Sequence, residues 1–572
     1  MKKLERRWWF QLGALAKPYW VSEERWGAWG LIVLLLVLLV GETRFNVLFN
    51  EQSGELTSAL AGRDGGRFWH SVRVFGWLLL VAVPIYAFYY FVRDNLSIRW
   101  RRWLTYRLLG SYLDARGYYA LLSNSEIDNP DQRLSEDINA FTQKSLSFLM
   151  VATSALLQLV AFSNVLWATS RLLVGFLVVY AAAGTLLTLG VFGKKLIRLN
   201  FQQLSREADF RFTLVRIREH AEPIAFYRGE AREEAQARGR FGALFENFNR
   251  LIRWTLGLNF FQYAFTLTTL ILPSIIIAPR VLSGELEVGR VVQAAGAFAA
   301  ILAALTIFVD NFDSLSRFAA GIERLHTFVA ALGEQAKGRG VPGATIVSSE
   351  GPRLAFENVT LQTPNQERTL VKELSFTVNP GEGLLIVGAS GGGKSSLLRA
   401  AAGLWNAGQG SIVHPPAEQM LFLPQHPYMI LGTLRDQLSY PSDPEGLSDS
   451  ELSQVLGRVN LPDIVQRCGG FDCPLDFDKV LSVGEQQRLA FARVLLQRPR
   501  YVMMDEATSA LDGDNEAGLY RQLQGSATTV VSVSHHPAVL PYHAHVLELT
   551  GDGGWRLCLA AEYEFDRRYL GD

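Results

Sequence analysis

With 572 residues, the chain is too long for a single hydrophobic core, so at least two domains are expected. Apolar residues make up 49% of the sequence and charged residues only 19%, whereas about a quarter is usual in soluble proteins. The formal net charge is zero, which gives no reason to expect nucleic acid as a partner.

The N-terminal region predicts a helix that lies at the membrane surface. Residues 17–26 mix aromatic and charged side chains, and Trp20, Trp26 and Trp29 are spaced to anchor a helix at the headgroup level. The first ten residues carry charges and no apolar core with a cleavage site. No removable signal peptide is therefore expected.

About six apolar stretches are long enough to cross a bilayer, which takes roughly 20 helical residues. The first is centred on an unbroken apolar run from Leu31 to Val40. The other expected spans are 72–91, 148–167, 172–192, 255–278 and 291–312. The N-terminal half is therefore predicted to be an all-helical membrane domain.

Basic residues indicate how these spans are oriented. They gather in the long loops after the second and fourth spans and are scarce in the opposite loops, so the N-terminus, both long loops and the C-terminal half should be cytosolic. Apolar residues at helical spacing, for example over 199–212, predict that the spans continue into two cytosolic helical hairpins. The basic residues are Arg93, Arg99, Arg101, Arg102, Arg107, Arg116 and Arg133 in one loop, and Lys194, Lys195, Arg198, Arg206, Arg211, Arg216 and Arg218 in the other.

A glycine-rich polar segment, 333–343, separates the two halves and predicts a linker. From Arg353 on, short apolar segments such as 354–361 and 528–533 are typical of strands. We therefore expect a membrane domain over 1–332, a linker over 333–350 and an α/β domain over 351–572. The cysteines, which match no zinc spacing, all lie in the last of these: Cys468, Cys473 and Cys558.

A phosphate-binding loop is predicted where an apolar strand, 384–387, is followed by Gly388–Ser395 and a helical stretch, 396–402. The glycines let backbone N–H groups turn toward a polyphosphate, and Lys394 would reach the β- and γ-phosphates. The Ser395 hydroxyl would complete a Mg²⁺ shell. Taken alone, the motif could also be a glycine-rich turn with a chance lysine. The other expected nucleotide contacts are Ser390, Gly391, Gly392, Gly393 and Ser396.

Five further segments follow this loop. Gln425 lies in 423–427, and downstream come 481–486 (LSVGEQ), 501–506 (YVMMDE), 509–512 (SALD) and 531–535 (VSVSH). Their order and content resemble the ATP-binding cassette (ABC) ATPase: a Q-loop, the ABC signature, Walker B, the D-loop and a switch histidine after the Walker A loop. The resemblance implies ATP and Mg²⁺ as cofactors, and a multidomain protein with a six-helix, exporter-type membrane domain and an α/β P-loop domain.

The resemblance also implies catalytic roles. Asp505 would hold Mg²⁺ through water, and Glu506 would orient and deprotonate the attacking water. Gln425 would sense Mg²⁺, and His535 would contact the γ-phosphate. The alternatives are a solvated acid at a strand end for Glu506 and a surface histidine for His535, next to His536.

One ATPase and about six spans make half of a transporter, because ABC sites close between two cassettes. Ser482, Gly484 and Gln486 would complete the site of a partner chain, with Ser482 at the start of a helix aimed at phosphate. No motif is degenerate, so both sites of a homodimer should be active.

The adenine contact departs from the ABC pattern. Residues 357–375 hold no aromatic side chain after Phe356, and Thr363 stands where a stacking aromatic is expected. Tyr440 is the candidate replacement, with a loop tyrosine packed on the ATPase as an equal alternative.

Further stretches are similar to the subfamily D half-transporters, which include fatty-acyl and cobalamin transporters and the bacterial YddA-like and SbmA/BacA-related proteins. These stretches are 96–105, 118–119, 127–133, 219–230, 403–406 and 423–437, and 18–26 favours the bacterial branch. The resemblance implies a multi-pass protein of a bacterial inner membrane that moves a solute across the bilayer.

The sequence indicates less about the transported solute. Uptake of a large hydrophilic solute such as cobalamin or a peptide is the first hypothesis; a lipid or fatty-acyl exporter and a non-transporting ABC ATPase are the rivals. Polar residues inside a span are costly unless they face the bundle interior, water or a neighbouring helix. The candidates are Gln158, Asn164, Gln262 and Asp310.

Overall fold

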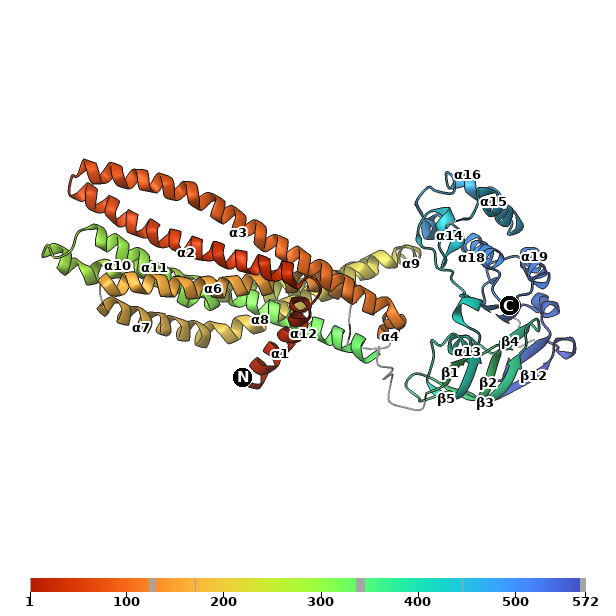
Figure 1. Cartoon of the computed structure of the whole chain (residues 1–572). Coiled ribbons are helices and arrows are strands. Elements are labelled where there is room, and N and C mark those ends of the chain that lie inside the picture. The colour runs from red at the N-terminus through yellow and green to blue at the C-terminus, as the bar shows by residue number, and fades with distance from the viewer. Residues whose placement is uncertain are drawn as a thin grey trace. The chain divides into compact units, whose positions relative to one another are not determined.

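The computed structural model describes residues 2–122, 127, 130–169, 171–335, 345–444 and 446–565. It divides into two compact units, 1–340 and 341–572 (Figure 1). Helix α12 continues to Gln335 and strand β1 begins at Val347, so the expected linker, 333–350, overlaps the ends of both elements.

The first unit consists of helices. Its long helices are α1 (Lys2–Trp20), α2 (Arg25–Ala61), α3 (Gly65–Leu113), α6 (Ile138–Thr169), α7 (Arg171–Leu187), α8 (Lys194–Glu219), α10 (Glu230–Leu282), α11 (Gly289–Asp310) and α12 (Phe312–Gln335). Shorter segments are η1 (Asp114–Arg116), α4 (Gly117–Leu122), α5 (Pro130–Gln132), α9 (Ala221–Tyr227) and two π-helical segments, η2 (Arg133–Asp137) and η3 (Thr188–Gly193).

Six helices of the described chain are long and apolar enough to cross a membrane, which confirms the prediction of six spans. Several are far longer than a bilayer requires. The 49 residues of α3 extend over about 74 Å at 1.5 Å per residue, against a hydrocarbon core of about 30 Å. The 53 residues of α10 likewise continue well beyond its apolar part, so α8 and α10 form a long hairpin with α9 between them.

The helices α2 and α11 approach each other through small residues. A Cβ atom placed on Gly289 would lie 1.9 Å from the carbonyl oxygen of Gly54, so the two backbones touch. The Ser58 hydroxyl accepts a hydrogen bond from the Gly289 N–H at 3.1 Å, and the Asn50 amide donates to the Gln293 carbonyl at 2.9 Å. In a membrane, where apolar surface gives little driving force between helices, such contacts hold spans together.

The expected surface helix over 17–26 is wrong in extent. Helix α1 ends at Trp20, where the Ser22 hydroxyl donates to the Tyr19 carbonyl and the chain turns before α2. Tyr19 is fully buried and stacks on Trp100 of α3, with ring centroids 5.6 Å apart. Trp26 and Trp29 are exposed, as membrane-surface anchors should be, but they belong to the first turns of α2.

The second unit is built on two main sheets. A four-stranded sheet has the order β1 (Val347–Glu350), β5 (Gly408–His414), β2 (Leu354–Gln362), β3 (Thr369–Val378). A six-stranded sheet has the order β12 (Trp555–Leu559), β11 (His545–Leu549), β4 (Leu384–Gly388), β10 (Thr529–Val533), β9 (Tyr501–Asp505), β6 (Met420–Leu423). Strands β7 (Leu431–Gly432) and β8 (Leu475–Asp476) form a separate pair. The helices are α13 (Lys394–Ala401), α14 (Leu434–Ser439), α15 (Asp449–Arg458), α16 (Ile464–Arg467), α17 (Phe477–Val480), α18 (Val483–Gln497) and α19 (Gly513–Gln524).

The six-stranded sheet separates two apolar cores. Strand β4 is buried along its whole length, and its side chains alternate between them, with Leu385 and Val387 in one core and Leu384 and Ile386 in the other. Strands β4, β9, β10 and β11 run parallel, so their carboxyl ends meet at one edge of the sheet. In open sheets of this kind, ligands bind at that edge.

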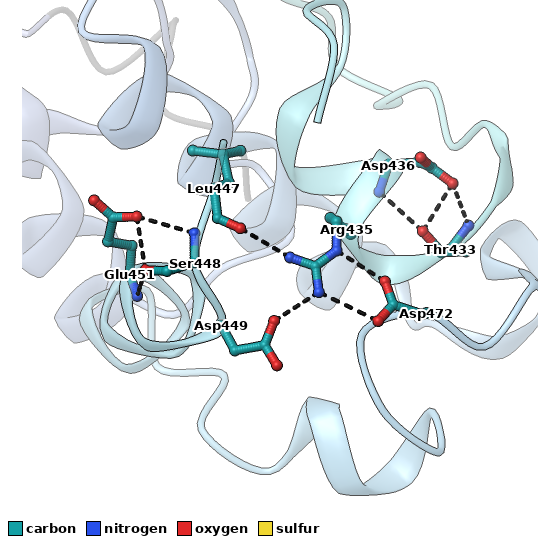
Figure 2. A network of polar contacts seen from close by, with 8 residues as sticks. All are labelled: Thr433, Arg435, Asp436, Leu447, Ser448, Asp449, Glu451 and Asp472. Atoms are coloured by element: carbon teal, nitrogen blue, oxygen red, sulfur yellow. Dashed lines mark hydrogen bonds and ion pairs between the residues drawn. The ribbon is translucent and has the colours of Figure 1, made fainter. Parts of the chain in front are cut away.

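Away from that edge, Arg435 of α14 ties together three segments of the helical part (Figure 2). Its guanidinium donates to Asp472 at 2.8 Å, to Asp449 of α15 at 2.6 Å and to the Leu447 carbonyl at 3.0 Å. The hydrogen bond from Arg435 also holds the pKa of Asp472 below its usual value. Capping boxes begin α14 at Thr433 and α15 at Ser448, so both helix starts are fixed by local hydrogen bonds.

Candidate functional site

The loop between β4 and α13 has a conformation that requires glycine at two positions. Gly388 has a φ of 138°, and a Cβ atom there would lie 2.3 Å from the Leu549 carbonyl oxygen. Gly393, which precedes the first residue of α13, has a φ of 98° and packs against Leu370. The first turn of α13 leaves the N–H groups of Lys394, Ser395 and Ser396 without partners inside the helix. The loop therefore fits an anion at a helix N-terminus.

Lys394 lies across this loop. Its ammonium group donates to the carbonyl oxygens of Gly388 at 2.8 Å and Ala389 at 3.1 Å, and the residue is buried. Burial lowers the pKa of Lys394 below its usual value, while the nearby Glu506 and Asp505 carboxylates oppose that shift. A phosphate in the loop would offer this amine a stronger acceptor than two carbonyl groups.

Two oxygen ligands suited to Mg²⁺ meet at the end of β9. The Ser395 hydroxyl, in the first turn of α13, donates to Asp505 Oδ1 at 2.8 Å. Asp505 is the last residue of β9, and its Cα is paired with Val533 at the end of β10. The parallel register thus brings Ser395 and Asp505 together, although they lie 110 positions apart in the chain.

Glu506 lies at the centre of the site. Its backbone has a φ of 50°, an uncommon conformation for a residue with a side chain, and its N–H donates to the Val533 carbonyl at 3.1 Å. The Gln425 amide donates to one carboxylate oxygen at 3.0 Å, and His535 Nε2 lies 3.4 Å from the other. Of the three residues predicted to be catalytic, Gln425 and His535 therefore each contact Glu506.

Ser482 forms the N-cap of α18. Its hydroxyl accepts from the Glu485 N–H at 3.4 Å, and the Glu485 carboxylate accepts from the Ser482 N–H at 3.0 Å, which makes a capping box. A hydrogen bond from Arg467 holds the pKa of Glu485 at about 2. Gly484 packs within 3.1 Å of the Ala510 carbonyl, measured from a Cβ placed on it, and the Gln486 amide donates to two carbonyl groups of its own loop.

Comparison with known proteins shows which family has this arrangement of residues. Residues 15–282 match the family model "ABC transporter transmembrane region 2", and residues 371–509 match the model "ABC transporter". The chain is 44% identical to an uncharacterized ABC transporter ATP-binding protein of Synechocystis sp., over 94% of this chain and 82% of that protein. It is 35% identical to ABC transporter D family member 2, chloroplastic, of Arabidopsis thaliana, over 96% of this chain and 88% of that protein.

The chain belongs to the ABC transporter family, in its D subfamily.

Two further proteins are similar to this ABC transporter over nearly its whole length. It is 31% identical to the lysosomal cobalamin transporter of Mus musculus, over 94% of each protein. Its fold is similar to that of a bacterial Atm1-family ABC exporter with ATP bound, with a TM-score of 0.74 at 17% identity, over 95% of this chain and 97% of that one. The predictions of an ABC half-transporter, of its fold and of ATP hydrolysis coupled to transport are thereby confirmed, and the chain is a multi-pass membrane protein.

Gln487 is one residue of the transporter's ATPase site that the motif analysis missed. It is buried, and its amide donates to the Gln425 carbonyl at 3.1 Å and to the Ser509 hydroxyl at 3.4 Å. Its side-chain oxygen accepts from the Ala510 N–H at 3.0 Å. One glutamine thus connects the signature helix to the Q-loop and the D-loop. The sequence feature that could have pointed to Gln487 is its position directly after the signature segment, 481–486.

Glu516 is a second residue that was missed. Its buried carboxylate accepts from the Thr508 hydroxyl at 2.6 Å and lies 3.0 Å from His536 Nδ1. Thr508 follows the predicted Walker B segment by two residues, and His536 is next to His535, the predicted switch histidine. Glu516 therefore joins two segments that meet at Glu506. A lone glutamate inside α19 gave no sequence signal for this contact.

The structure gives Tyr440 a different set of neighbours from the Walker A loop. The Arg493 guanidinium lies 5.4 Å from its ring centroid, and the Tyr428 ring packs edge-on at 5.7 Å. A contact with adenine stays a prediction for this residue. Arg368 is a second candidate, because its guanidinium lies 3.5 Å from the Gly551 carbonyl oxygen, and Gly551 lies against Gly392 of the loop.

The polar residues of the spans differ from one another. The Gln158 amide donates to Ser154 of its own helix at 3.1 Å, whereas Gln262 lines a cavity described below. Asn164 is exposed on α6. Asp310 ends α11, but its side chain lies outside the described part of the structure.

Proposed function

We propose that two copies of the chain form a transporter in which ATP is hydrolysed at two composite sites. Each site would combine the Walker A loop of one copy, Gly388–Ser395, with the signature residues of the other, Ser482, Gly484 and Gln486. The observation that carries this proposal is the Glu506 carboxylate, held between Gln425 and His535 beside the phosphate loop. This is the arrangement needed to position an attacking water at a γ-phosphate.

In this proposal Ser395, Asp505 and Gln425 hold Mg²⁺. A hydroxyl and a carboxylate in direct contact, with an amide nearby, match the preference of Mg²⁺ for oxygen ligands completed by phosphate and water. The ion would neutralise charge on the phosphates during transfer. Lys394 and the backbone N–H groups of the loop would hold the phosphates, so the protein's own part is to bind and orient them.

Glu506 would accept the proton of the attacking water, and His535 would orient that water and the γ-phosphate. In the structure both side chains are directed at each other. Arrival of the phosphate would give His535 a new partner and release one oxygen of Glu506. The contacts of Gln425 with Glu506 and of Gln487 with the Gln425 backbone would carry this change to the Q-loop.

Coupling to the membrane unit would pass through two short segments. One is 129–133, of which residue 129 lies outside the described structure, and the other is 224–229 at the tip of the α8–α10 hairpin. At that tip, Phe226 and Tyr227 are 80% and 88% exposed, which is unusual for aromatic side chains and fits a docking surface. We propose that both segments dock near Gln425 and Tyr428 of an ATPase unit.

We further propose that the protein lies in a bacterial inner membrane with its ATPase units in the cytoplasm. The basic loops support this orientation. For the solute, we propose a large hydrophilic molecule such as cobalamin or a peptide. The name of the Mus musculus relative supports the first of these, and the five polar residues among the lining of a cavity in the membrane unit agree with both.

The variant Glu506→Gln tests the proposal. It removes the proton acceptor but keeps Lys394 and the loop, so ATP hydrolysis should fall by about 10² to 10⁴ while ATP stays bound. The measurement is ATP turnover and retained nucleotide in the full-length protein in nanodiscs. Glu418→Gln, at an exposed turn of the same unit, is the matched control and should behave as wild type. Wild-type turnover in Glu506→Gln would refute the assignment.

A further inference from the structure

A cavity of about 270 Å³ lies among three of the membrane-spanning helices. Its walls come from segments far apart in the chain: the end of α7 with the start of η3, the middle of α10, and α11. The lining residues are Gly184, Thr185, Thr188, Phe261, Gln262, Phe265, Thr266, Ala299, Leu302, Ala303 and Thr306. The volume is at the lower end for ligand sites, so it suits one group of a larger solute.

Five of the lining side chains are polar, although the helices that carry them are apolar. They are Thr185, Thr188, Gln262, Thr266 and Thr306. The Thr188 hydroxyl is bonded to the Gly184 carbonyl of its own helix at 2.8 Å. Within the described part of the chain, the Gln262 amide has no hydrogen-bond partner, in contrast to Gln158. The Thr306 hydroxyl likewise donates to the Ala303 carbonyl at 3.5 Å. A polar group inside a span is costly unless it meets another polar group, so the Gln262 amide is the lining group that a solute could satisfy.

The backbone is irregular at the same place. The helix that begins as α7 becomes π-helical over Thr188–Gly193, starting at a residue that lines the cavity. Such π-helical segments occur often at functional sites. One turn before it, Gly184 lets the Phe265 ring approach closely, since a Cβ atom at Gly184 would lie 2.4 Å from that ring.

Aromatic rings form the apolar part of the lining. Phe265 stacks on Tyr180 with centroids 4.1 Å apart, and the Tyr180 hydroxyl donates to the Phe265 carbonyl at 2.8 Å. Phe261 lies one turn along α10, with its ring 5.7 Å from that of Phe265. Because Phe265 stacks on Tyr180 and abuts Gly184, its ring is held in place in the cavity wall.

No lysine, arginine, aspartate or glutamate is among the described residues that line the cavity. We propose that it is a solute-binding subsite for an uncharged group that carries an amide or hydroxyl beside an aromatic or apolar part. Gln262 and the threonine hydroxyls would bond its polar atoms, and Phe261 and Phe265 would pack on the rest. A carboxylate or phosphate would lose its hydration there without gaining a cation. This inference rests on the proposed function, since it names the chemistry of the transported solute.

The test measures protection of single cysteines in the full-length protein. The sequence has no cysteine before Cys468, so Cys468→Ala, Cys473→Ser and Cys558→Ser give a background free of thiols. Thr266→Cys places a thiol in the cavity. Thr268→Cys is the matched control, because Thr268 lies on the same helix, is exposed and is outside the lining. Labelling by N-ethylmaleimide in nanodiscs is followed with two probes of nearly equal size, neutral N-acetylphenylalanine amide and anionic N-acetylphenylalanine.

The proposal predicts that the neutral amide slows labelling of the Thr266→Cys variant several-fold and that the anion does not. Neither probe should protect the Thr268→Cys variant, and adding Gln262→Leu should abolish the protection, whereas adding Gln158→Leu should not. Equal protection by both probes, protection of both thiols, or no protection would each overturn the proposal. ATP trapping by Glu506→Gln needs none of these residues, so failure here is distinguishable from failure of the proposed function.

Discussion

The two units of the molecule place their polar residues in different ways. In the ATPase unit, Ser395, Asp505, Glu506 and His535 all follow strand ends or begin a helix, and the parallel register of β4, β9 and β10 brings them to one edge. In the membrane unit, polar residues are spread along long helices, and only the packing of three helices brings a few of them to one cavity. A site at a sheet edge can thus be predicted from local sequence, whereas a site in a helix bundle depends on tertiary contacts.

Glu516 supports the sheet-edge site from inside the ATPase unit, and its replacement should have the largest effect. Glu516→Leu should lower maximal ATP turnover about tenfold or more and destabilise the unit by about 2 kcal/mol, since Thr508 and His536 lose a buried charged acceptor. Steady-state kinetics and thermal unfolding of the full-length protein measure both effects.

His536→Arg is the companion variant. Arginine can still donate to Glu516, so turnover should stay near the wild-type value in this variant. If Glu516→Leu lost stability but kept full turnover, Glu516 would have a purely structural role and would not help to position the catalytic segments.

Gly289 tests how closely the helices of the membrane unit pack. A side chain at this position meets the Gly54 backbone at 1.9 Å, so Gly289→Val must separate α2 from α11. We expect a cost of about 1–3 kcal/mol or more, the usual range for overpacking. Gly175→Val is the matched control, because a Cβ atom at Gly175 meets nothing within 4 Å. Melting of the protein in nanodiscs measures the difference, and equal melting temperatures would show that this contact is not close.

The smallest effect concerns the adenine. Arg368 lies near the loop at Gly551, while the Arg493 guanidinium lies over one face of the Tyr440 ring. We therefore expect Arg368→Ala to raise the KM for ATP about tenfold, in line with roughly 1–3 kcal/mol for a stacked base. Tyr440→Ala should then change KM less. An ATP titration of both variants separates the candidates, and a larger rise in Tyr440→Ala would favour the tyrosine predicted from the sequence.

These residues show how far the sequence could predict the site. The phosphate loop could be anticipated because strand, loop and helix follow one another in a few residues. The cluster of Glu506 with Gln425 and His535 could be anticipated although Gln425 lies 81 positions away, because the three segments resemble motifs of the ABC ATPase. Gln487 and Glu516 could not be assigned contacts, because their partners lie 62 and 20 positions away and depend on how α18 and α19 pack. The adenine partner was uncertain for the same reason.

In the membrane unit, hydropathy predicted the six spans but could not rank their polar residues. Gln158 and Gln262 are the same residue type in similar apolar surroundings. One is bonded within its own helix, and the other lines a cavity made with two other helices. That difference arises from the packing of α7, α10 and α11, for which a single sequence carries no local signal.

A nucleotide-dependent cross-link tests whether ATP is held between two copies of the chain. Ser390→Cys in the phosphate loop and Ser482→Cys at the signature are combined with Glu506→Gln in the thiol-free background. After mild oxidation of the full-length protein with ATP and Mg²⁺, we expect a covalent dimer on a denaturing gel, which is absent without ATP and absent with either cysteine alone. A chain that stays monomeric with ATP, or a dimer that forms equally without it, would show that ATP is not held between two copies.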